Sequence, residues 1–251
     1  DEVQWEAVPH NGNVSLPNGD EIPATVTSFT QSTEESAFFA MSTPSIWRTG
    51  GVPDGPLGLE TLMVAVLLHE AVHVSQFPTY GQDMSQLSER HDLPESFNDD
   101  SIQHRFDQTP EFVASVEAEI DLLLEAAFSE DDAEVRSLAR KARQLMQQRR
   151  DRWFTGDEAY LSAAEDIWLT LEGSGQWVGY TWLIDEAGHG ASSDEALAGF
   201  GSRSRWWTQN QGLALALIID RLDSRWKTEV FRDGGRTLTR LVDDAIDPNR
   251  P

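Results

Sequence analysis

Two histidines and a glutamate lie close together in the segment His69-Glu70-Ala71-Val72-His73. Four residues advance an α-helix by about 400°, so the imidazoles of His69 and His73 project from one face, about 6 Å apart, and can share one metal ion. Glu70 lies about 100° around the helix, where its carboxylate can reach a water molecule on the metal rather than the metal itself. The spacing therefore predicts a metal site with Glu70 as the general base.

The chain has no cysteine, so a bound metal must use histidine and carboxylate ligands. A catalytic zinc ion takes three protein ligands and keeps one position open. The extended motif H-E-x-x-H-x-x-G-x-x-H is absent, because Gln76 and Thr79 occupy its glycine and last histidine positions. Glu172 is the main candidate for the third ligand, since it lies in an apolar and aromatic stretch, 168–177, where a charge is costly without a partner.

Other glutamates compete with Glu172 for a place at the metal. Glu165 lies seven positions earlier, on the same helix face but about 10 Å away along the axis. That distance favours a role in orienting a ligating histidine over metal binding. Glu117 and Glu119, on a predicted helix after Pro110, are further candidates for the third ligand.

Several residues are candidates for donating a proton or stabilising a transition state. His104 and His189 lie in polar segments. A histidine in such a segment is ordinarily an exposed surface residue, and the alternative is that it donates a proton or stabilises a transition state. Three more residues are candidates of the same kind: Arg203, Arg205 and Tyr180.

These motifs resemble those of the gluzincins, zinc peptidases whose third ligand is a glutamate on a second helix. A more specific resemblance is to poorly characterised bacterial metallopeptidase-like proteins of the H-E-x-x-H-x-x-Q type, and it is carried by Gln76, Glu165, Glu172-Gly173 and Tyr180. The segment 207–212, which leads into the apolar run 213–222, is similar to their C-terminal active-site helix. The resemblance covers about residues 59–246, and only the H-E-x-x-H and Glu-Gly segments are specific.

The resemblance implies a zincin-like helical domain that binds Zn²⁺ and cleaves a peptide or protein substrate. The sequence departs from the familiar pattern in two ways. His73 and Glu172 are 99 residues apart, a far longer separation than in the familiar gluzincins. Trp206, Trp207 or Gln209 also stands where a tyrosine is expected, so the resemblance assigns no oxyanion-stabilising group.

The chain is strongly acidic, with 43 acidic and 19 basic side chains and a net charge of −24 over 251 residues. Such a surface repels phosphate backbones and anionic membranes, so we expect no nucleic-acid partner. The longest apolar run, 62–68, is too short to span a bilayer, so we expect no transmembrane segment. The first residue, Asp1, and the presence of only two lysines favour a periplasmic or secreted protein.

The hydrophobic pattern predicts a mainly α (α+β) protein in two parts. Residues 1–58 are rich in Pro, Gly, Ser and Thr and are expected to form loops and a few strands that pack on a helical catalytic domain, 59–251. Within 1–58, strands are expected at 24–29 and 36–41. The expected helices are 59–77, one that starts at Pro110, 132–152, 157–183, 211–222 and 238–246, with loops at 79–110 and 185–204.

Together these features predict a zinc metallopeptidase with His69, His73 and Glu172 as ligands. An alternative is a metal-binding scaffold or partner-binding protein that keeps the H-E-x-x-H helix without hydrolysing peptides. A third interpretation, a calcium-stabilised exported protein, is prompted by the acidic segment 185–195. That segment does not match the ligand spacing of an EF-hand.

Overall fold

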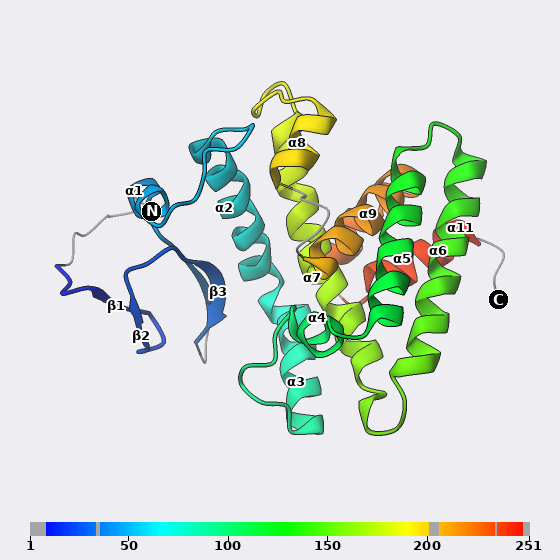
Figure 1. Ribbon diagram of the computed structural model, residues 1–251, viewed down its shortest axis with the longest axis horizontal. Helices are drawn as coiled ribbons and strands as arrows, with labels where there is room; N and C mark the ends of the chain where they lie inside the picture. The colour runs from blue at the N-terminus through cyan, green and yellow to red at the C-terminus, as the bar shows by residue number, and fades with distance from the viewer. Residues whose placement is uncertain (1–8, 34–35, 201–205, 234, 248–251) are drawn as a thin grey trace.

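The computed structural model describes residues 9–33, 36–200, 206–233 and 235–247. They form a mainly helical fold with two short antiparallel hairpins near the N-terminus, which confirms the predicted fold class (Figure 1). In chain order the elements are β1 (Asn13–Ser15), β2 (Glu21–Pro23), β3 (Ser28–Ser32), β4 (Ala37–Met41), α1 (Pro44–Thr49), α2 (Leu59–Gln76), η1 (Phe77–Gly81), α3 (Gln82–His91), α4 (Ser101–Phe106), α5 (Pro110–Phe128), α6 (Asp132–Trp153), η2 (Gly156–Glu158), α7 (Leu161–Ile184), α8 (Ser193–Phe200), α9 (Trp207–Leu222), α10 (Trp226–Thr228), η3 (Glu229–Asp233) and α11 (Leu238–Ile246).

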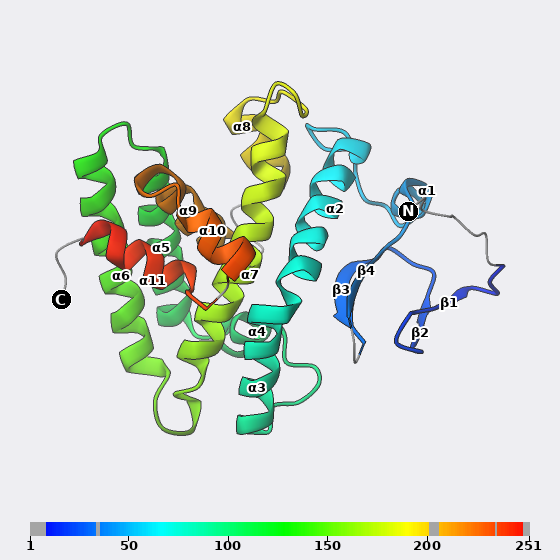
Figure 2. The same cartoon turned by 180° about the vertical axis from the view of Figure 1, so that it is seen from behind.

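Helix α7 lies at the centre of the helical body. It packs against α2 on one side and α9 on the other, and α5 and α6 form an antiparallel pair beyond α9, as Figures 1 and 2 show from opposite sides. Most of α7 is buried because its middle, 169–176, is enclosed by both neighbours. The helix that carries Glu172 is therefore held rigidly between two others.

The crossing of α7 and α9 depends on a pair of glycines. A Cβ added at Gly173 would lie 2.5 Å from the carbonyl group of Gly212, and one at Gly212 would lie 2.6 Å from the Cα of Gly173. Side chains at these positions would force the helices apart. Two glycines, each costly inside a helix, are thus explained by close backbone contact.

The N-terminal hairpin β3–β4 packs directly on α2. Its second strand matches the expected strand at 36–41, whereas the first is shifted toward the C-terminus, to Ser28–Ser32. Alternation places Ser28 and Thr30 on the same face of β3, and this face meets α2. The small β region thereby contributes polar groups to the helix that carries the two histidines.

Two of the predicted loops are wrong, because each contains helix. The 79–110 segment includes α3 and α4, on which two pairs of apolar side chains recur at helical spacing and are buried: Met84 with Leu87, and Ile102 with Phe106. The expected helix 59–77 corresponds to α2, which ends at Gln76, and Pro78 lies in the first turn of η1, where no helical N–H is required. The 185–204 segment includes α8.

A network of buried ion pairs joins α5, α6 and α7. Arg149 donates from Nε and Nη2 to Glu119, at 2.9–3.1 Å, and its Nη1 lies 2.9 Å from Glu165. Arg150 donates to the other Glu165 oxygen at 2.7 Å. Each charge in this network is compensated, so Arg149 and Arg150 of α6 join the helices inside the helical body.

Within the described ranges, no helix combines the length and apolarity needed to cross a bilayer.

Candidate metal centre

Three predicted ligands converge where α2 meets α7. The Nε2 atoms of His69 and His73 are 2.8 Å apart, and they lie 3.3 and 3.1 Å from the two carboxylate oxygens of Glu172. One donor atom from each residue lies within 4.8 Å of the other two. The contact between α2 and α7 thus brings two imidazole nitrogens and one carboxylate to a single point.

The electrostatics of this group are dominated by the shared carboxylate. Burial would raise the pKa of Glu172, but the imidazoles of His73 and His69 hold that pKa well below its usual range. Burial would lower the pKa of His73, yet Glu172, with help from Glu70 and Asp99, raises it. The centre therefore favours an ionised carboxylate facing positive charge, which a metal ion can supply as well as a proton.

Gly175 allows α7 to approach the first histidine. A Cβ at this position would lie 2.7 Å from Nδ1 of His69 and 2.9 Å from Cε1. The same Nδ1 atom is buried without a hydrogen-bond partner among the described residues. The ring is thus held in place by packing against Gly175 rather than by a hydrogen bond to Nδ1.

We expect Gly175→Ala to weaken zinc binding by about 10- to 100-fold, because the new methyl group displaces the His69 ring. The dissociation constant is measured by competition with a chromogenic chelator. Gly179→Ala is the matched control: on the same helix, its Cβ would meet Phe200 and the Ala65 carbonyl instead of His69. An equal loss of affinity in both variants would show that general disruption of α7, not the histidine, is responsible.

Gln76 and Ser174 join the two ligand-bearing helices next to the metal donors. Gln76 Nε2 donates to Ser174 Oγ at 2.9 Å, and Ser174 Oγ lies 3.2 Å from Gln76 Oε1. Both side chains are fully enclosed. Gln76 lies three residues after His73 and Ser174 two residues after Glu172, so this contact fixes the register of α2 against α7.

The carboxylate of Glu70 is oriented by the N-terminal hairpin. Ser28 Oγ donates to Oε1 and Thr30 Oγ1 donates to Oε2, both at 2.8 Å. Glu70 as a residue is 7% exposed, and its charge acts on His73. Sequence reasoning missed both hydroxyl residues, because their two-residue spacing places them on one face of a strand but does not indicate which helix that face meets.

Asp99 is a second residue that sequence reasoning missed. Burial, together with the carboxylates of Glu172 and Asp100, raises its pKa to about 8, and it also interacts with His73. Its backbone carbonyl accepts a hydrogen bond from Thr208 Oγ1 at 3.0 Å, which attaches this segment to the start of α9. Asp99 lies between α3 and α4, and only tertiary packing places it at the centre.

The competing glutamates lie elsewhere. Glu165 and Glu119 belong to the buried network with Arg149 and Arg150, and Glu117 is exposed on α5. Among the described residues, the His69, His73 and Glu172 group is the one set of metal-type donors that meets at a point.

The other candidates are also placed away from the donors. Tyr180 is buried in an apolar cluster with Leu57 and Ala65. His104 is exposed on α4, and His189 is exposed after α7, where its ring stacks on Trp182 with centroids 6.3 Å apart. The two remaining candidates lie outside the described residues: Arg203 and Arg205.

The start of α9 carries the residues that replace the expected tyrosine. Trp207 packs against Phe112, and its backbone N–H donates to Gln103 Oε1. Gln209 Oε1 accepts a hydrogen bond from Gln176 of α7 at 2.8 Å. These contacts connect α9 to α4, α5 and α7.

Comparisons of this chain with protein-family models, with curated proteins and with solved structures each gave no match.

Proposed function

We propose that this chain is a zinc-dependent hydrolase that cleaves peptide bonds. The observation that supports the proposal is the convergence of His69, His73 and Glu172 on one point, with Glu70 next to the two histidines on α2. Two histidines and a carboxylate form one of the ligand sets of catalytic zinc, which keeps a further position open.

The donor set fits a divalent cation. Two imidazole nitrogens 2.8 Å apart face the carboxylate of Glu172, whose side chain is 7% exposed, and form a buried site in which one cation can satisfy all three groups. In a chain without cysteine, nitrogen and oxygen donors are suited to zinc. The site therefore suits zinc in two respects: the chemical type of its ligands and the convergence of their donor atoms.

The proposed chemistry divides between the metal and the protein. Zinc, when bound, supplies a Lewis acid that polarises a peptide carbonyl and lowers the pKa of water toward about 7. Glu70 takes a proton from the attacking water on a carboxylate oxygen and passes it to the leaving amine nitrogen. Ser28 and Thr30 fix the plane of this carboxylate, and two hydrogen bonds leave lone pairs free for the proton.

A second candidate function is a metal site that does not catalyse hydrolysis. The hydrogen bonds from Ser28 and Thr30 favour it, because they also give Glu70 a structural role in holding β3 on α2. The two functions differ in whether peptide cleavage accompanies metal binding.

Metal removal tests the proposal. We expect the purified protein to contain about one zinc per chain, to cleave members of a diverse peptide library, and to lose this activity on treatment with a chelator. Adding back zinc restores cleavage, and circular dichroism checks that the metal-free chain stays folded. Cleavage by the metal-free chain would overturn the proposal, whereas bound zinc without cleavage of any peptide would favour the second candidate.

A further inference from the structure

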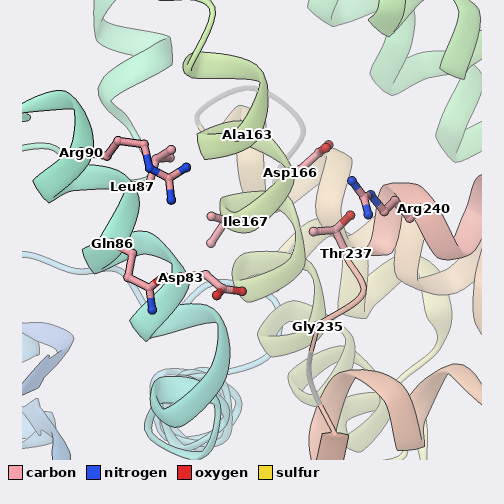
Figure 3. A pocket seen from close by; sticks show the side chains of 10 residues that line it. All are labelled: Asp83, Gln86, Leu87, Arg90, Ala163, Asp166, Ile167, Gly235, Thr237 and Arg240. Carbon is pink, nitrogen blue, oxygen red and sulfur yellow. The ribbon is translucent and has the colours of Figure 1, made fainter.

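A cavity of about 300 Å³ lies between α3, α7 and the start of α11, and none of its lining residues belongs to the metal centre. Figure 3 shows α3 on one side and Thr237 with Arg240 on the other. Leu87, Ala163 and Ile167 provide apolar surface. The cavity is large enough for a small organic molecule and combines charged walls with an apolar patch.

Two arginines face this cavity without an acidic partner. The guanidinium groups of Arg90 and Arg240 point into the space from opposite sides (Figure 3), and neither makes a hydrogen bond or ion pair with a described residue. Residues 1–125 contain 22 acids and three bases. Arg48 pairs with Glu60 and Arg105 pairs with Glu158. Arg90, the third base of this region, lines the cavity and has no such pair within the described part of the chain.

The two acidic residues at the cavity differ in how they are compensated. Asp166 accepts hydrogen bonds from Arg150 and from Thr239 on the same oxygen, both at 2.8 Å, so its charge is balanced inside the protein. Asp83 is exposed on α3 and makes no hydrogen bond or ion pair with a described residue. The cavity thus presents two uncompensated positive charges and one uncompensated negative charge.

We propose that this cavity binds a free acidic amino acid. The two carboxylates of such a ligand match Arg90 and Arg240, its ammonium group matches Asp83, and its methylene groups meet Leu87 and Ile167. Charge-assisted pairs with guanidinium are among the stronger hydrogen bonds. This assignment uses none of the metal-centre residues and does not depend on the proposed hydrolase activity.

Isothermal titration calorimetry with L-glutamate tests the assignment. We expect one ligand per chain, and Arg90→Gln and Arg240→Gln each to raise the dissociation constant at least about 10-fold. Lys141→Gln is the matched control, because Lys141 is an exposed cation on α6 that makes no ion pair with a described residue and lies outside the cavity. Thermal unfolding checks that each variant is folded.

Two further probes separate an acidic amino acid from a simple anion. Succinate has both carboxylates without the ammonium group, and inorganic phosphate has neither carbon chain nor ammonium. We expect L-glutamate to bind more tightly than both, and Asp83→Asn to weaken glutamate binding without weakening succinate binding, because succinate has no ammonium group to pair with Asp83. Equal binding of all three probes, unaffected by Asp83→Asn, would overturn the assigned ligand.

The metal centre provides a final check. His73→Ala removes a metal donor and is expected to leave L-glutamate binding intact. Loss of glutamate binding in this variant, absence of binding to the unmodified protein, or unchanged affinity in both arginine variants would each overturn the proposal.

Discussion

Replacing Glu70 with glutamine should leave zinc bound and lower peptide hydrolysis by about 100- to 10,000-fold, the range typical of a lost general base. The amide keeps the size of the side chain, so Ser28 and Thr30 still find a polar partner. It has no carboxylate oxygen to accept the proton. The measurements are the zinc content of the variant and kcat/KM on a peptide cleaved by the unmodified protein.

Glu60→Gln is the matched control for this experiment. Glu60 lies on the same helix but is exposed, and it pairs with Arg48 near the surface. Its replacement should change neither zinc content nor turnover. If Glu70→Gln cleaved the peptide at the rate of the unmodified protein, Glu70 would not be the general base and the proposed mechanism would be wrong.

Replacing Glu172 with alanine should weaken zinc binding by at least about 100-fold, because even residues that only support a ligand contribute about 10- to 100-fold. Glu172 supplies the anionic donor of the site, 3.1 and 3.3 Å from the two histidine nitrogens. The zinc-to-protein ratio after dialysis and a chelator competition assay measure the loss, and hydrolysis should fall with it.

Two other glutamates serve as controls for the identity of the third ligand. Glu117→Ala changes an exposed residue of α5, and Glu165→Gln changes a buried residue of α7 that pairs with Arg149 and Arg150. Both variants should keep their zinc. Zinc content at the normal level in Glu172→Ala, or its loss in Glu165→Gln, would move the third ligand elsewhere.

The sequence predicted the donor residues more completely than their surroundings. His69 and His73 follow from helical spacing alone, and Glu172 from a charge in an apolar stretch. The hydroxyls of Ser28 and Thr30 and the carboxylate of Asp99 could not be assigned in this way, because they reach the centre from a hairpin and a connecting segment far away in the sequence. Local periodicity carries no information about such contacts.

The same distinction applies to the fold. Helix α6 lies close to the predicted 132–152 and α11 matches 238–246, and α5 begins at Pro110 as predicted, since apolar positions recur at helical spacing in these segments. The short helices α3, α4 and α8 were taken for loops, because few buried residues and a polar composition obscure their period. Glu165 was expected near the metal from its helix face, but buried arginines of α6 hold it instead.

The separation of the ligands along the chain has a consequence for the order of folding. His73 and Glu172 are 99 residues apart, and the helices α3 to α6 lie between them. Bringing such distant segments together costs chain entropy, so contacts of this kind form slowly. During synthesis, a chain that has reached only α6 offers two histidines and no carboxylate partner from α7. Stable metal binding is therefore a late event, and acquisition of zinc marks a chain whose α7 has already docked between α2 and α9.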